Sequence, residues 1–255
     1  MPLSATDLDD LARAKALLET PGFAAQLTAY LGAPIEFGLR KLPAAVGRRL
    51  GATIEAVLLR IATTAVATMA ETGAPAKGGH ALAAGLAGGV AGFFGPPALL
   101  VEVPLTTGTI FRSIAAIARA EGESPADPET VLACLEVFAL GGTGTGDDAA
   151  DAGYYAVRAA LAQQVKASAD FLARGGGGAP LLLAWVRRVA ERLGVQYTEK
   201  LAAQAVPVVG ALGGAAVNTV FIRHFQAMAQ GHFTVRRLER AHGRETVREA
   251  WNRLP

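Results

Sequence analysis

The chain has 255 residues, of which 51% are apolar and only 6% aromatic, and its formal net charge is +2. Such a length suits one large domain or two small ones, and the single cysteine excludes a disulfide framework and a cysteine-based metal cluster. The mean hydropathy of +0.32 is high for a soluble protein and low for a polytopic membrane protein. Because alanine and glycine supply much of the apolar content, we expect an interior built by closely approaching helices.

The charges are distributed unevenly along the chain. Residues 121–151 contain eight acids and no lysine or arginine, whereas residues 223–253 contain seven arginines and three glutamates. This asymmetry predicts pairing between the two regions inside the molecule, or a basic face toward phospholipid or another acidic partner. The basic residues are not interleaved with stacking aromatic side chains, so no nucleic acid partner is expected.

Helical patterns follow one another along the chain, and no convincing alternation predicts a strand. The first helix follows the capping side chains of Ser4 and Asp7 and ends at Leu18. The later helices are expected over residues 23–31, 35–69 with breaks at Pro43 and Gly51, 106–120, 128–140, 147–173, 181–193, 201–228 and 234–251. The acidic N-terminus lacks an apolar stretch, so we expect no signal peptide and a cytoplasmic location.

Two uncharged runs organise this pattern. The first, residues 78–101, has 24 positions without a charge, seven glycines and a Pro96–Pro97 pair, and the second covers residues 201–222. Each run is long enough to cross roughly 30 Å of hydrocarbon, and glycines at four-residue spacing allow helices to approach closely in lipid. Prolines interrupt both runs. A buried hairpin in a soluble core, peripheral or re-entrant insertion, and full spanning are therefore the alternatives.

The predicted fold is an all-α multi-helix bundle around these two glycine- and alanine-rich apolar helical hairpin segments. We expect residues 1–33 to form an N-terminal helical segment and residues 34–255 to form a single domain. Cys134 lies in an apolar stretch, where a buried and unreactive thiol is expected.

No pattern of polar residues identifies a reaction. The glycine-rich stretch 141–146 lacks the lysine of a phosphate loop, and the acids that follow it would repel phosphate. His224 and His232 lie two helical turns apart, too far to share a metal without further ligands. Glu102 borders the first uncharged run, where pairing with a basic neighbour such as Arg112 is expected. The residues that could contribute to a polar site are Glu102, Arg112, Asp147, Asp148, Tyr155, Arg158, Asn218, His224 and His232.

Several short motifs occur in a characteristic order. The first is a glycine-rich run that ends on Glu102-Val103-Pro104. The motifs that follow are FALGG at 138–142, DD at 147–148, GYYAVR at 153–158, AVPVVGA at 205–211 with Asn218, and GHFTVRRLER at 231–240. Together they resemble the EcsC family over residues 34–251. Glu102 stands where that family's acidic-x-Pro motif has aspartate more often.

The resemblance implies a bacterial, mostly helical protein and admits association with a membrane. The family takes its name from a protein encoded beside the two components of an ABC transporter. It provides no catalytic residue that could be carried over to this sequence.

We therefore expect a non-enzymatic protein, peripheral to the inner membrane on its cytoplasmic face, that binds lipid or assists an ABC exporter. The residues expected to contact lipid are Phe93, Phe94, Leu99, Leu100, Arg236, Arg237 and Arg240. For the three arginines, pairing with the acidic middle of the chain is the alternative. No cofactor or metal is expected, and the sequence does not indicate an oligomeric state.

Two other functions remain open at this point. One is a metal-assisted hydrolase with a site near Glu102, Asp148, His224 and His232, which requires these side chains to converge in a pocket. The other is a plain partner-binding module, which would have neither a converging site nor an exposed apolar patch rimmed by arginine.

Overall fold

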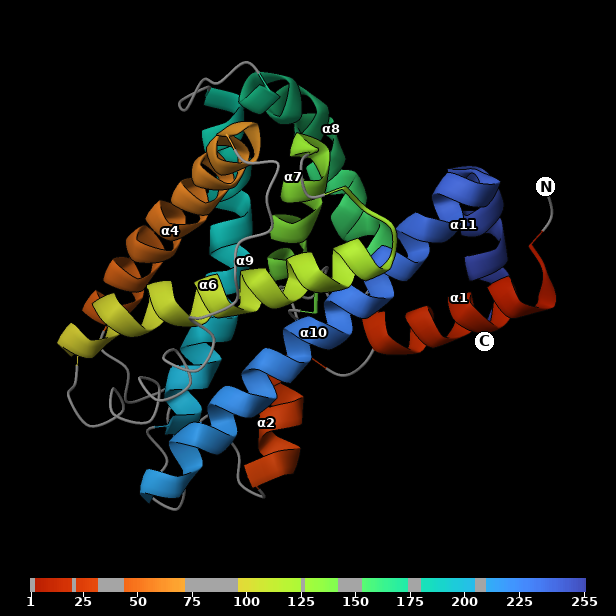
Figure 1. Cartoon of the computed structure of the whole chain (residues 1–255). Helices are drawn as coiled ribbons and strands as arrows, with labels where there is room; N and C mark the ends of the chain where they lie inside the picture. The colour runs from red at the N-terminus through yellow and green to blue at the C-terminus, as the bar shows by residue number, and fades with distance from the viewer. Residues whose placement is uncertain are drawn as a thin grey trace.

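The computed structural model describes residues 3–19, 22–31, 44–71, 96–124, 127–141, 153–173, 180–204 and 210–255. In these ranges all regular structure is helical, which confirms the predicted all-α bundle (Figure 1). The helices are α1 (Ala5–Leu18), α2 (Phe23–Leu31), α4 (Ala44–Glu71), α6 (Pro96–Ala120), α7 (Pro128–Glu136), the 3-10 helix η1 (Val137–Ala139), α8 (Tyr154–Ala173), α9 (Pro180–Gln204), α10 (Gly210–His242) and α11 (Arg244–Arg253).

The start of α1 is set by the two residues predicted to cap it. Asp7 N–H donates to Ser4 Oγ at 3.2 Å, and Ser4 N–H donates to Asp7 Oδ2 at 3.0 Å. This capping box satisfies backbone donors that have no partner within the helix. The buried face of α1, made by Leu11, Ala14 and Leu18, packs on α10 and belongs to the main apolar core. The boundary expected between an N-terminal segment and the main domain stays a prediction.

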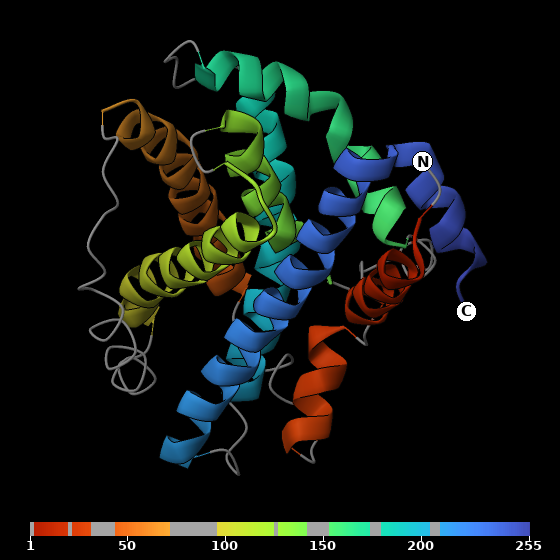
Figure 2. The same ribbon diagram turned by 45° about the vertical axis from the view of Figure 1, so that its right-hand side comes forward.

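The helix α10 has 33 residues and is about 50 Å long. Helices α1, α2, α6, α9 and α11 pack against it, and Figures 1 and 2 both show α10 running diagonally past them. The separate helix predicted over residues 234–251 is wrong, because α10 continues to His242 before α11 begins. Gly243 separates the two helices with a φ of +88°, a conformation that favours glycine.

Three other helices are longer than their patterns predict. α4 passes through Gly51, where a break is expected, and α9 continues beyond residue 193 to Gln204. α6 begins at Pro96, ten residues before the predicted start at residue 106. A proline at the start of a helix costs no hydrogen bond, because the first N–H groups have no partner inside the helix. Pro104 lies within α6 and removes one backbone donor there.

Only parts of the two uncharged runs can be followed. Residues 96–101 of the first run are in α6, and residues 78–95 lie outside the described part of the chain. The second run is divided, since residues 201–204 end α9 and residues 210–222 begin α10. Among the helices of the described ranges, none combines the length and the apolar character needed to cross a bilayer.

The short helix α7 and η1 form the centre of the bundle. Every residue from Thr130 to Leu140 is buried, and α4, α6, α8 and α9 pack around this segment. Cys134 lies here with 2% of its surface exposed, and burial raises the pKa of its thiol to about 12. The predicted burial of Cys134 is therefore confirmed, and a pKa raised this far leaves little thiolate at pH 7.

Candidate binding grooves and buried polar groups

Glu102 forms a buried ion pair with Lys200, which joins α6 to α9. Lys200 Nζ donates to Glu102 Oε1 at 2.6 Å, and their side chains are 0% and 7% exposed. Burial lowers the pKa of Lys200, while the charge and hydrogen bond of Glu102 oppose that shift. The predicted pairing of Glu102 with Arg112 is wrong, because Arg112 lies ten residues further along the same helix, about 15 Å away. Arg112 is exposed on α6.

The predicted pairing of the basic C-terminal region with the acidic middle of the chain is confirmed for three arginines. Arg236 Nε donates to Glu123 Oε1 at 2.8 Å, and Arg240 binds the same carboxylate. Arg237 Nε donates to Glu121 Oε2 at 2.7 Å, while its Nη2 binds an aspartate of α1 at 2.6 Å. These guanidinium groups are the ones expected to contact lipid. That contact stays a prediction, and it would require these ion pairs to be broken or shared.

Arg158 joins α8 to α10. Its guanidinium donates two hydrogen bonds, of 2.8 and 2.9 Å, to the Glu239 carboxylate, and it lies 5.3 Å from the Tyr154 ring centroid. Trp251 of α11 packs against the rings of Tyr154 and Tyr155, each at 5.3 Å. These contacts are those of a packing cluster between α8, α10 and α11. Within the described part of the chain, the Tyr155 hydroxyl is buried without a hydrogen-bond partner.

His232 and Glu136 face each other in the interior without touching. His232 Nε2 lies 4.0 Å from Glu136 Oε2, and the side chains are 0% and 7% exposed. Tyr154 Oη is 3.0 Å from His232 Nδ1, and no hydrogen bond to a described residue reaches Nε2. Burial raises the pKa of Glu136 to about 7 and lowers that of His232 well below its ordinary value. His232 is therefore neutral at pH 7, where Glu136 is close to the midpoint of its titration.

His224 is a packing residue of α10. Its Nδ1 lies 3.1 Å from Gln26 Nε2, and burial lowers its pKa to about 4. Gly141 approaches the other side of the ring with a φ of +70°, and a Cβ there would lie 2.7 Å from His224 Nε2. Only glycine fits this position, because both the backbone conformation and the space exclude a side chain.

The residues of the alternative hydrolase do not share a site in the described part of the chain. Glu102, His224 and His232 contact different partners, on α9, α2 and α8 respectively. No group of three or more metal-ligating side chains occurs among the described residues. Asp147 and Asp148 lie outside them. A metal-assisted hydrolase remains a hypothesis that these contacts do not support.

The remaining candidate residues for the polar site and for lipid contact are one asparagine of α10 and four apolar residues at positions 93–100. Asn218 lies on α10, and its Oδ1 is buried without a hydrogen bond to any described residue. Leu99 and Leu100 fall within α6, but their side chains are not among those described. Phe93 and Phe94 lie outside the described residues.

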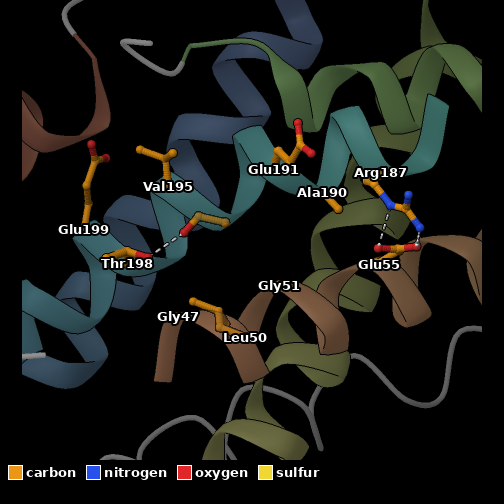
Figure 3. Close-up of a pocket in the computed structure, with 11 residues that line it drawn as sticks. Gly47, Leu50, Gly51, Glu55, Arg187, Ala190, Glu191, Val195, Thr198 and Glu199 are labelled. Carbon is orange, nitrogen blue, oxygen red and sulfur yellow. Dashed lines mark hydrogen bonds and ion pairs between the residues drawn. The ribbon is translucent and has the colours of Figure 1, made fainter. Parts of the chain in front are cut away.

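A groove of about 590 Å³ lies between α4 and α9. Figure 3 shows Arg187 and Glu55 reaching toward each other across its end, and Arg187 Nη2 lies 3.3 Å from Glu55 Oε1. Three glycines keep this space open, since an added Cβ would meet nothing within 4 Å: Gly47 and Gly51 on α4 and Gly194 on α9.

Glu199 lies at the other end of this groove from the Arg187–Glu55 pair (Figure 3). Its side chain is mostly buried, and burial raises its pKa to about 7 against the effect of a hydrogen bond from the Ala24 N–H. Ala24 is in the first turn of α2, where a carboxylate complements the helix dipole. We therefore interpret Glu199 as a residue that attaches α9 to α2.

A second groove, of about 700 Å³, lies on another side of α4, against α6. Its only charged lining residue in the described ranges is Arg60, which is exposed. Pro104 and Gly108 form the α6 wall. Val101 and Leu105 form the neighbouring row on α6, and they are 61% and 41% exposed. Apolar surface of this kind beside a hollow is typical of an interaction site.

Sequence reasoning missed Lys200 and both grooves. A signal for the ion pair exists, because Glu102 borders the first uncharged run and Lys200 borders the second with the opposite charge. Two runs that pack together bring such bordering charges close. The α4–α9 groove has a weaker signal in Gly47 and Gly51, which lie four residues apart on one face of α4.

The chain matches a family model described as the EcsC protein family over residues 41–238. This range covers more than half of the chain and includes the residues that line both grooves. Neither a curated protein nor a solved structure matches the chain.

Proposed function

The chain belongs to the EcsC family, and from that premise we propose that it is a non-enzymatic protein that associates peripherally with an anionic membrane surface. The site of association is the edge formed by α4 and α6. The membrane in question is the inner membrane, approached from its cytoplasmic face, where the protein binds lipid or assists an exporter.

The observation that carries this proposal is the pair of exposed apolar side chains beside the α4–α6 groove. Val101 and Leu105 lie one turn apart on α6 and expose 61% and 41% of their surface. Fully burying an exposed side chain of this size contributes roughly 1.5–3 kcal/mol, and each of these partly exposed residues would contribute about half of that in lipid. Because the groove continues the apolar surface toward α4, the patch is larger than two scattered side chains.

The arginines of α4 supply attraction to anionic headgroups. Arg48, Arg49 and Arg60 are exposed, and none forms an ion pair with a described residue. A basic helix beside an apolar edge is a common arrangement in proteins that bind membrane surfaces. This attraction does not depend on Arg236 or Arg240, whose charges are paired internally.

The test is co-sedimentation of the full chain with vesicles of phosphatidylcholine alone or mixed with phosphatidylglycerol, at low and high salt. We expect pelleting with the mixed vesicles that high salt weakens but does not abolish, because apolar contacts resist screening. The double variant Val101→Glu/Leu105→Glu should stay in the supernatant. Leu181→Glu is the matched control, since Leu181 is 50% exposed on α9.

Two results would decide against the proposal. The wild-type chain would fail to pellet with anionic vesicles at any salt concentration, or the double variant would pellet as well as the wild type. Equal loss in Leu181→Glu would mean that the apolar contact is not specific to the α4–α6 edge.

A further inference from the structure

The walls of the α4–α6 groove suit a hydrocarbon chain. Its volume of about 700 Å³ falls within the range of roughly 300–1,000 Å³ that is usual for small-molecule sites. Most of the wall is aliphatic, and the side chains that provide it are Ala52, Ala56, Val57, Ile61 and Pro104.

The two threonines that line the groove have interaction partners without a ligand. Thr53 Oγ1 donates to the Arg49 carbonyl at 2.9 Å, within its own helix. Thr64, at the other end of the lining, also has an interaction partner. A hydrocarbon in the groove would therefore leave the Thr53 hydroxyl with its hydrogen bond, and the loss of such a bond is the usual cost of burying an apolar ligand against polar walls.

The charge of the groove selects an anion. Arg60 is the only charged residue in its described lining, and no acid lies there to neutralise it. Arg49 and Arg60 belong to one row on α4 that includes Thr53 and Thr64, because these positions recur at three- and four-residue spacing. The guanidinium of Arg60 can bind two oxygens of one phosphate, which lysine cannot do with the same geometry.

The backbone of α6 leaves the groove open. A Cβ added at Gly108 would meet nothing within 4 Å, so the space continues to the helix backbone itself. We propose that this groove binds one acyl chain of an anionic membrane phospholipid, with the phosphate at Arg60. This assignment rests on the proposed membrane association, and it deepens that function by naming the lipid class and the contact residue.

The experiment fills the groove without unfolding the protein. Gly108→Leu places a side chain in the open space, and Gly194→Leu makes the same change in the α4–α9 groove, where an added Cβ also meets nothing within 4 Å. The probe is monomeric palmitoyl-lysophosphatidylglycerol, titrated into the full chain and measured by calorimetry. We expect Gly108→Leu to weaken binding roughly tenfold or more. Gly194→Leu should bind as the wild type does.

A separate measurement tests the proposed contact between the lipid phosphate and Arg60. Wild-type protein should bind palmitoyl-lysophosphatidylglycerol more tightly than palmitoyl-lysophosphatidylcholine, and Arg60→Gln should remove that preference. Arg119→Gln is the control, because Arg119 is exposed in the last turn of α6, about three turns beyond Gly108. Equal affinity of the wild type for the two lipids would overturn the role of Arg60.

Failure of this inference differs from failure of the proposed function. If wild type and Gly108→Leu bind the monomeric lipid equally while the wild type still pellets with anionic vesicles, the groove is overturned and membrane association stands. If the wild type does not pellet with vesicles, the proposed function falls, and a membrane phospholipid is overturned as the occupant.

Discussion

Glycine plays opposite roles at the contact between α1 and α10 and in the surroundings of α4. Where α1 packs on α10, a Cβ added at Gly231 would lie 2.7 Å from Leu18 Cγ and 3.0 Å from the Ala14 carbonyl oxygen. Around α4, four glycines have nothing within 4 Å of an added Cβ: Gly47, Gly51, Gly108 and Gly194. Gly231 allows the backbones of α1 and α10 to approach closely, whereas the four glycines near α4 leave open grooves.

An ion pair of α10 and an ion pair of α4 differ in the same direction. Arg236 of α10 binds Glu123, and the two side chains are 19% and 6% exposed. Beside α4, the Glu55–Arg187 pair is 28% and 57% exposed, and Arg60 has no ion pair with a described residue. The difference teaches that glycine content alone does not identify tight packing. We place binding along α4 because that helix has space beside it and exposed arginines that form no ion pair with a described residue.

The largest effect should come from the buried ion pair that joins α6 to α9. Lys200→Met leaves the Glu102 carboxylate buried and unpaired, which should lower the free energy of unfolding by about 3–5 kcal/mol. Urea denaturation at pH 7 measures this change. The double variant Glu102→Leu/Lys200→Met should recover most of the loss, because no buried charge remains. A loss below about 1 kcal/mol in the single variant would contradict the assignment.

The second effect depends on pH and concerns Glu136 of α7, which faces His232 of α10 in the interior. Burial raises its pKa to about 7, well above the value of about 4.3 in an unfolded chain. The folded state therefore holds this proton more tightly. The resulting stabilisation is complete below about pH 4 and is lost as pH rises through about 7.

Glu136→Gln cannot ionise, so it should gain stability relative to the wild type between pH 5 and pH 8, by about 2–3 kcal/mol. Thermal or urea unfolding at both pH values measures the difference. Glu129→Gln, an exposed position on the same helix, should show little change. A wild-type-to-variant difference that is constant with pH would show that Glu136 is already ionised at pH 5.

The glycines themselves sharpen the comparison. Gly231→Ala should lower the free energy of unfolding by about 1–3 kcal/mol, because the new methyl group overlaps α1. Gly108→Ala should raise it by up to about 1 kcal/mol, since alanine favours the helix and meets no neighbour. Denaturation of the two variants under identical conditions provides the measurement. Similar changes in the free energy of unfolding of the two variants would remove the distinction between the α1–α10 contact and the surroundings of α4.

The smallest effect is expected at the exposed Glu55–Arg187 pair. Its removal by Arg187→Ala should change the free energy of unfolding by less than about 1 kcal/mol, because solvent screens the two charges. Urea denaturation in low and high salt measures it. A loss comparable to that of Lys200→Met would mean that α4 is held to α9 mainly by this pair.

The sequence predicts the local elements better than their limits. The range of α2 and the cap of α1 follow directly from capping residues and periodicity. The starts and ends of α6 and α10 do not, because proline is compatible with the first turn of a helix and no propensity distinguishes Gly231 within α10 from Gly243 after it. That distinction depends on backbone conformation set by tertiary packing.

The candidate site is less predictable for a similar reason. The pairing of residues 223–253 with residues 121–151 follows from charge alone. The partner of Glu102 does not, because Lys200 lies 98 residues away and only the packing of α6 on α9 brings it near. The open space beside Gly108 has no signature in the sequence, since Gly231 is likewise a glycine inside a long helix and an added Cβ there would overlap α1.

The most direct test of the central claim places a fluorescent reporter at the α4–α6 edge. Val101→Cys labelled with an environment-sensitive dye is compared with Leu181→Cys, and Cys134 should not react because it is buried and its pKa is raised to about 12. We predict that phosphatidylglycerol vesicles shift the emission of the dye at position 101 to shorter wavelength and leave the dye at position 181 unchanged. No shift at position 101, or an equal shift at both positions, would contradict a membrane-facing α4–α6 edge.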